Sequence, residues 1–325
     1  MKSAGARGGA HGQRRVIYGA LLGNLLVAAT KFCAAAFTGS SAMLSEGVHS
    51  LVDTGNELLL LYGMRRAARP ADQRHPLGHG RELYFWSFMV SLLIFAIGST
   101  VSVYEGVERI LHPASISTPA VNYAVLALGM LFEGSSWWVA LGEFRRAKGD
   151  DGYLDAMRDS KDPPTFMVLF EDSAALIGLA IAAAGTAAAQ ISRMAVFDGL
   201  ASVAIGVLLF TVAVLLTRET KGLLIGEGAR EEVVASICSI ARGLPGVESA
   251  NGLYTVHLGP RQVVAGLSVH FADHLTAAQV ETIVARIEAG VRKVHPEIVS
   301  ITVKPESVAA YQASQARLGD SSDGE

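Results

Sequence analysis

Long apolar segments dominate the N-terminal part of the chain. A helix needs about 20 mostly apolar residues to cross the hydrocarbon core of a bilayer. The segments that reach this length are Val16–Phe37, Ser41–Tyr62, Ser87–Leu111, Ala120–Leu141, Pro164–Ala189 and Met194–Leu216. The pattern therefore predicts a domain of six transmembrane helices over residues 16–218, preceded by a short tail of residues 1–15.

A different pattern begins after the last apolar segment. Residues 219–306 combine amphipathic helical periodicity with the alternation of apolar and polar positions that is typical of strands. The expected helices are Arg230–Arg242 and Thr276–Val294, and the expected strands are Gly252–Leu258, Gln262–Ala272 and Glu297–Lys304. This order predicts a small α+β domain of αββαβ, ferredoxin-like type, with its helices on one face of the sheet. The polar residues 307–325 are predicted to form a disordered tail.

The composition agrees with a membrane protein. Hydrophobic residues make up 50% of the chain and charged residues only 18%, whereas soluble domains average about 25% charged residues. The formal net charge of -3 is too small to indicate a nucleic-acid partner. The two cysteines, Cys33 and Cys238, are far apart and indicate neither a disulfide framework nor a cysteine-based zinc site.

Lysine and arginine predict the orientation in the membrane, because cytoplasmic loops carry an excess of both. The loops after the second and fourth expected spans are rich in them, at Arg65, Arg66, Arg69, Arg74, Arg81, Arg145, Arg146, Lys148, Arg158 and Lys161. The opposite side holds Arg193, with Arg109 at the end of the third span. We therefore expect an integral, multi-pass membrane protein with both termini in the cytoplasm, in the inner membrane if the source is bacterial.

The second expected span contains a polar stripe that a lipid-facing helix would not carry. Its residues are Glu46, His49, Asp53, Asn56 and Glu57. Steps of three, four, three and one residues place them along one side of a helix. A charge at the centre of a bilayer costs about 2.5–3.5 kcal/mol, and such residues usually mark an ion path. The alternative is that they pair with one another and hold helices together, but five polar groups in one stripe favour the ion path.

The polar stripe supplies candidate metal ligands. His49 and Asp53 lie one helical turn apart, a separation at which two side chains can bind one ion. The fifth span adds the adjacent carboxylates Glu171 and Asp172. His49, Asp53 and Asp172 would form a mixed nitrogen and oxygen site with one open position, which suits a divalent ion that must bind and leave. Glu171 points about 100° away from Asp172 on a helix, so it is either a fourth ligand or a structural partner, for example of Lys31.

A second candidate site lies in the loop between the second and third spans. Asp72, His75 and His79 are spaced by three and four residues, and Gly78 and Gly80 allow the loop to fold tightly. Two imidazoles and one carboxylate can bind a cation, and a solvated basic loop is the equally weighted alternative.

Four histidines of the expected C-terminal domain are His257, His270, His274 and His295. They show no closely spaced ligand pair. His257 and His270 lie on adjacent expected strands, where we interpret them as surface residues rather than metal ligands, and we expect the domain to serve as a dimerisation element.

The polar stripe and the loop together match a known family. The segment "GSSAMLSEGVHSLVDTGNELLLLYG" followed by "ADQRHPLGHGRELYFWSF" closely resembles the cation diffusion facilitators, which are dimeric metal-ion/proton antiporters. The resemblance covers nearly the whole chain and is closest to the branch that contains the mitochondrial zinc transporter, which shares the Glu171–Asp172 pair. It implies that His49, Asp53 and Asp172 bind the transported ion and that the loop binds zinc. Val168 stands where the family usually has a ligand, so the fourth ligand differs in this chain.

These features predict a divalent metal cation exporter that exchanges Zn²⁺ for protons and works as a homodimer in the bilayer. Metal ligands must be deprotonated to bind, so metal ions and protons compete for the same groups. A site that faces the two sides alternately converts this competition into exchange.

Several alternatives stay open. One is a transporter selective for manganese, iron or cobalt, and another is a non-transporting metal sensor or scaffold. An intramembrane metallohydrolase would activate water on a metal, but no His-Glu-x-x-His motif occurs in the chain. We therefore expect no enzymatic activity and no cofactor other than the transported ion.

Overall fold

The computed structural model describes residues 18, 21–33, 36, 41–112, 119–148, 152–153, 156–157, 160–194 and 196–320. Within these ranges, the side chains of residues 41–49, 52, 95, 119, 121–122, 147 and 318–320 lie outside the description. The chain divides into two units. The helical unit contains Met1–Pro70 and Arg81–Leu224, and the C-terminal unit contains Ala71–Gly80 and Ile225–Glu325.

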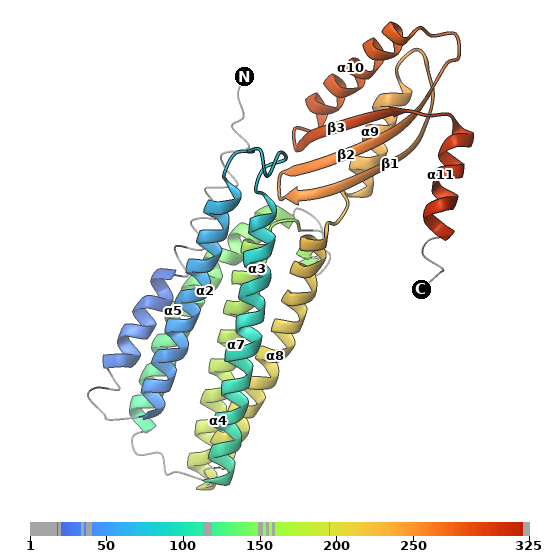
Figure 1. Ribbon diagram of the computed structural model, residues 1–325. Coiled ribbons are helices and arrows are strands. Elements are labelled where there is room, and N and C mark those ends of the chain that lie inside the picture. The colour runs from blue at the N-terminus through green and yellow to red at the C-terminus, as the bar shows by residue number, and fades with distance from the viewer. Residues whose placement is uncertain are drawn as a thin grey trace. The chain divides into compact units, whose positions relative to one another are not determined.

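Long helices make up the helical unit (Figure 1). A first apolar helix covers Leu21–Cys33. The helices that follow are α2 (Ser41–Ala67), α3 (Arg81–Leu93), α4 (Thr100–Leu111), α5 (Pro119–Lys148), α7 (Pro163–Ser192) and α8 (Val196–Ile225). A π-helical segment, η1 (Ile94–Ser99), joins α3 to α4, so that Arg81–Leu111 forms one continuous span.

Local sequence explains where the longest helices begin and end. Two prolines, Pro163 and Pro164, open α7, where their missing N–H groups need no partner. Arg193 ends α7 in the left-handed conformation, with a φ of 56°. Basic residues occupy the last turn of α5, where they complement the negative end of the helix dipole.

Four helices are long and apolar enough to cross a membrane. They are Arg81–Leu111, Tyr123–Arg146, Pro163–Ser192 and Val196–Ile225, and they correspond to the third to sixth predicted spans. The second predicted span forms α2, a helix of 27 residues, which is not among these four. The first predicted span is described as a continuous helix only over Leu21–Cys33, and much of Val16–Phe37 lies outside the described residues. A count of six spans therefore stays a prediction.

Ion pairs join neighbouring helices near their ends. Arg66, in the last turn of α2, donates to the carboxylate of Glu82 in the first turn of α3, with an Nη2–Oε1 distance of 2.6 Å. Arg109, in the last turn of α4, donates to Asp198 in the first turn of α8, also at 2.6 Å. Between these ends the unit has an apolar core in which Leu60, Phe166 and Leu216 are completely or almost completely buried.

A mixed three-stranded sheet forms the centre of the C-terminal unit (Figure 1). Its elements are α9 (Glu231–Arg242), β1 (Val247–Gly259), β2 (Gln262–Phe271), α10 (Ala277–Val294) and β3 (Ile298–Pro305). The strand order is β1-β2-β3, with β1 and β2 antiparallel and β2 and β3 parallel. The predicted αββαβ order is thereby confirmed.

The alternation along β2 explains why the two helices share one face of the sheet. The apolar residues of one face, Val263, Ala265, Leu267, Val269 and Phe271, are all buried in the core of this unit. The same core receives Ile237 and Ala241 from α9 and Ile283, Ile287 and Val291 from α10. A capping box, in which Thr276 and Gln279 exchange hydrogen bonds, starts α10.

The end of the chain differs from the sequence prediction. Val308–Asp320 form a helix, α11, where a disordered tail was predicted. The Tyr311 side chain lies over Gly252 of β1, so closely that a side chain at position 252 would overlap it. The prediction of disorder rested on the small number of apolar residues in this segment. Composition does not reveal that one aromatic side chain of the segment contacts the sheet. The predicted boundary at residue 218 is also early, because α8 continues to Ile225.

Glu306, which lies just before α11, is bound by hydrogen bonds to β2 and β3. Lys304 Nζ and Ser268 Oγ donate to its two carboxylate oxygens, at 2.6 and 2.9 Å. These hydrogen bonds, with that of Lys304 the stronger, hold the pKa of Glu306 below its ordinary value of 4.5. A carboxylate with a lowered folded-state pKa adds stability above its unfolded pKa, and this stability is lost as pH falls through the folded value.

We therefore expect Glu306→Gln to lower the melting temperature of the full chain at neutral pH. The difference from the unmodified chain should shrink as the pH falls below 4.5, the ordinary value for this group. Glu281→Gln, at an exposed position of α10, is the control. Equal shifts for the two variants in a thermal melt would contradict the assignment.

Candidate metal site

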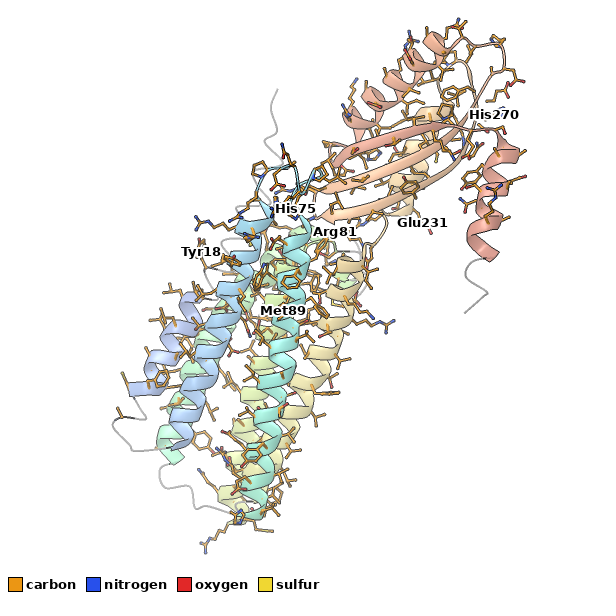
Figure 2. The ribbon with its side chains drawn as sticks, viewed as in Figure 1. Tyr18, His75, Arg81, Met89, Glu231 and His270 are labelled. Atoms are coloured by element: carbon orange, nitrogen blue, oxygen red, sulfur yellow. The ribbon has the colours of Figure 1, made fainter. Side chains whose placement is uncertain are left out.

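Three potential metal ligands lie close together in the loop between α2 and α3, where Figure 2 labels His75. His75 Nδ1 lies 3.3 Å from Asp72 Oδ1, and His79 Nε2 lies 3.4 Å from Asp72 Oδ2. One ligand atom from each residue lies within 4.8 Å of the other two, and the imidazole rings are 4.3 Å apart. The structure thus brings together the three residues predicted for this loop, which we call the loop cluster.

Short backbone contacts give the loop cluster its shape. Asp72 Oδ1 accepts the backbone N–H groups of Arg74 and His75, at 2.9 and 2.7 Å, as aspartate does in tight turns. Gly78 has a φ of +88° and donates its N–H to the His75 carbonyl at 2.9 Å. Only glycine adopts this conformation without strain, so Gly78 allows the chain to bring His79 back toward Asp72.

The loop packs on the β1–β2 hairpin. A side chain at Gly80 would overlap the Leu258 carbonyl and the side chain of Gln262, so only glycine fits this approach. His79, next to it, is buried, whereas Asp72 and His75 are exposed. The Gln262 Oε1 atom is also buried, without a hydrogen-bond partner among the described atoms. These contacts explain why residues 71–80 belong to the C-terminal unit rather than to the helices that flank them in sequence.

The loop cluster has the donor set of a divalent metal site. Two imidazole nitrogens and one carboxylate suit Zn²⁺ and similar ions, and three protein ligands leave a coordination position open. The backbone N–H of His75, followed by that of Arg74, holds the pKa of Asp72 below its ordinary value. The carboxylate is therefore ionised at neutral pH and ready to bind a cation.

The predicted intramembrane ligands come from α2 and α7. Asp53 is partly buried, and Asp172 is only 3% exposed. The Oδ2 atom of Asp172 has no hydrogen-bond partner among the described atoms. Glu171 Oε1 accepts a hydrogen bond from Asn56 Nδ2 at 3.3 Å, which joins α7 to the polar stripe of α2. His49 belongs to α2, but its side chain lies outside the described residues.

The structure does not bring the intramembrane acids into one compact group. Among the described side chains, the loop cluster is the group of three or more candidate ligands close enough for one ion, and Asp53, Glu171 and Asp172 do not form another. Val168, one turn before Asp172, is 1% exposed and packs in the apolar core. The transport site predicted around His49 therefore stays a prediction.

Two contacts join the first helix to α2, and sequence reasoning did not predict either. Asn24 Nδ2 donates to Glu57 Oε1 at 2.7 Å, and Lys31 Nζ donates to Ser50 Oγ at 2.9 Å. All four residues are at most 6% exposed. Lys31 thus donates to Ser50, and its pairing with Glu171 stays a prediction. A signal was available, because Asn24 and Lys31 are seven residues apart, as are Ser50 and Glu57, so both pairs lie two helical turns apart.

The histidines of the C-terminal unit are not grouped. His270 Nδ1 lies 3.4 Å from Glu248, and His295 Nε2 lies 2.7 Å from Ser236 Oγ. His257 is 7% exposed, so its interpretation as a surface residue is wrong. None of them belongs to a three-ligand group within the part of the chain that the structure describes.

Comparison with known domain families decides the class of the protein. Residues 17–225 match the model of the cation efflux transmembrane domain, and residues 229–308 match the cytoplasmic domain of cation efflux proteins. The chain belongs to the cation efflux family. The resemblance to the cation diffusion facilitators is thereby confirmed, and this family consists of transporters rather than enzymes.

Curated members of the cation efflux family align with most of the chain. The Homo sapiens protein named Proton-coupled zinc antiporter SLC30A9, mitochondrial, is 34% identical over 263 residues, which are 80% of this chain and 46% of that protein. Metal tolerance protein C4 of Arabidopsis thaliana is 31% identical over 254 residues, 77% of this chain and 55% of that protein. Cation-efflux pump FieF of Escherichia coli is 24% identical over 312 residues, 93% of this chain and 98% of that protein. The chain thus spans about half the length of the first two relatives.

The loop cluster predicts a measurable loss of bound metal. We expect Asp72→Ala and His79→Ala each to remove one bound Zn²⁺ per chain from the purified full-length protein, as counted by elemental analysis after dialysis. The unmodified site should also lose its ion on acidification, because protons compete with metal ions for ligand atoms.

His274→Ala is the matched control, because His274 is an exposed histidine of the same unit outside the loop cluster. The same metal content in His274→Ala and Asp72→Ala would show that the loop cluster is an ordinary surface ion pair.

Proposed function

We propose that the chain is a proton-coupled exporter of divalent metal ions, with Zn²⁺ as its substrate. The observation that carries this proposal is the burial of ionisable side chains from the polar stripe of α2 and from α7 between long apolar helices. Glu57 and Asp172 are 2% and 3% exposed, and each has an oxygen without a hydrogen-bond partner among the described atoms. Buried acids in a membrane domain are costly and usually serve an ion path.

The topology that fits this function has six spans and both termini in the cytoplasm. Four helices have the length and apolar character of spans. The first helix and α2 supply the other two, because α2 turns Glu57 toward the first helix and Asn56 toward α7, through the contacts Asn24–Glu57 and Asn56–Glu171. Glu57 is therefore shielded from lipid, which helps a helix that carries acids to span the membrane.

The transported ion binds at His49, Asp53 and Asp172 in this proposal. One imidazole and two carboxylates give the nitrogen and oxygen donors that suit Zn²⁺. Because Val168 offers no donor, the fourth position is filled by Glu171, which already faces α2, or by water. The name of the human relative, proton-coupled zinc antiporter, supports zinc among the divalent ions that such donors accept.

Exchange for protons follows from the chemistry of these ligands. A divalent ion can bind only when the imidazole and the carboxylates are deprotonated. Arrival of the ion therefore releases protons, and protons that arrive from the other side release the ion.

The loop cluster is a further cation site outside the membrane helices. The C-terminal unit serves homodimerisation, which is supported by its match to a domain model named for the dimer.

The two acids of α7 should differ in importance. We expect Asp172→Asn to abolish Zn²⁺ uptake into vesicles, because it removes charge from a ligand, and Glu171→Gln to retain part of the uptake. Circular dichroism and gel filtration should show that both variants remain folded. The opposite ranking would mean that Glu171 is the ligand and that Asp172 has a structural role.

The transport assay itself tests the proposed function. We expect sealed vesicles that contain the unmodified protein to accumulate Zn²⁺, and a proton gradient in the opposite direction to accelerate uptake. His49→Ala and Asp53→Ala should abolish uptake. Calorimetry should show binding heats that depend on the ionisation enthalpy of the buffer, because protons are released. Uptake that ignores the gradient, with heats independent of the buffer, would refute antiport, and a complete lack of uptake would favour a sensor or scaffold.

A further inference from the structure

Glu57 is a buried acid of the polar stripe that the predicted transport site does not use. It lies one turn after Asp53 on α2 and is 2% exposed. Its Oε1 atom accepts the hydrogen bond from Asn24 at 2.7 Å. Its Oε2 atom is buried and has no hydrogen-bond partner among the described atoms. One oxygen of the carboxylate is thus held by a hydrogen bond, and the other can still accept a hydrogen bond or bind a cation.

The surroundings of Glu57 repel a negative charge. Electrostatic interactions connect its carboxylate to Glu171, Asp172, Asp53 and Glu133, in decreasing order. These acids come from α2, α5 and α7. The described hydrogen bonds to Glu57 and Glu171 come from the amides of Asn24 and Asn56, which donate without supplying positive charge. The hydrogen bond from Asn24 therefore leaves the negative charge of Glu57 in place.

Helix packing alone does not explain this arrangement. If Glu57 served only to hold the first helix, the neutral amide of glutamine would accept the same hydrogen bond from Asn24. It would also place an NH₂ group where Oε2 now lies unpartnered among acids. A glutamate is the less stable choice at this position, and residues that reduce stability in this way are common at functional sites.

We propose that Glu57 is a further residue of the cation path and contacts the divalent ion through Oε2, one turn along α2 from Asp53. The proposal rests on the transport function proposed above. A divalent ion would bring positive charge to Glu57, whose described hydrogen-bond partner is an uncharged amide, and carboxylate oxygens are suitable ligands for it. Asn24 is a positioning residue, because its hydrogen bond to Oε1 fixes the orientation of the carboxylate.

The decisive experiment uses Glu57→Gln in the full-length protein. We expect the KM for Zn²⁺ uptake into vesicles to rise at least tenfold. In the absence of metal, the melting temperature should stay unchanged or increase, because the variant removes repulsion and fills the unused acceptor site. The increase in melting temperature caused by added Zn²⁺ should become smaller. The control is Glu105→Gln, which alters a partly buried acid of α4 outside this region and should leave KM unchanged.

Each outcome decides between a contact with the ion and a structural role. An unchanged KM in Glu57→Gln, together with normal uptake by the unmodified protein, would overturn the proposal and leave the transport function intact. A higher KM that comes with a lower melting temperature in the absence of metal would also overturn it, because the loss would then reflect folding. If the unmodified protein neither transports nor binds Zn²⁺, the transport function fails and this inference fails with it.

Asn24→Leu separates positioning from contact. This variant removes the donor to Oε1 but leaves the carboxylate in place. We expect KM to rise by a smaller factor than in Glu57→Gln, with kcat unchanged. An unchanged KM would overturn the positioning role of Asn24.

Discussion

Placing carboxylates among apolar helices is the constraint on which the helical unit depends. A buried charge is costly unless it has a partner, and the partner decides what the charge can do. Near the helix ends, Glu82 and Asp198 are neutralised by Arg66 and Arg109. In the interior of the unit, the described hydrogen bonds to Glu57 and Glu171 come from uncharged asparagine amides.

This contrast separates structural acids from acids that can receive a cation. An arginine holds its carboxylate in a fixed pair that has no need of a metal ion. An amide fixes the orientation of a carboxylate but leaves its charge in place. The helical unit therefore contains both acids that are neutralised by arginine and acids that accept hydrogen bonds from amides. Ion pairs join α2 to α3 and α4 to α8, while the asparagine hydrogen bonds to Glu57 and Glu171 leave the charges of these two acids in place.

Much of the fold could be predicted because apolar periodicity depends on local sequence. Length and apolar character identified the four spans, and alternation along β2 identified the buried face of the sheet. α11 was missed because Tyr311 is an isolated aromatic residue in a polar segment, and its contact with Gly252 depends on tertiary structure. The contacts of Asn24 and Lys31 were missed for a similar reason, since pairing across two helices requires their relative register.

The sites could be predicted to different degrees. The loop cluster lies within one turn-rich segment, so its spacing was sufficient to predict that Asp72, His75 and His79 come together. The intramembrane acids come from helices far apart in sequence, and their distances depend on how those helices pack. Val168, which the sequence already showed where the family usually has a ligand, packs in the apolar core.

The packing of residues 71–80 on the β1–β2 hairpin has a consequence for the order of biosynthesis. The loop leaves the ribosome long before Leu258 and Gln262, which contact Gly80. At about 5–20 residues per second, the delay is on the order of ten seconds or more. During this time the membrane helices are made while the loop has no surface to pack on. A chain interrupted after α8 would contain all the described helices of the helical unit and still have an unpacked loop, so a hairpin translated after these helices completes a loop that precedes most of them.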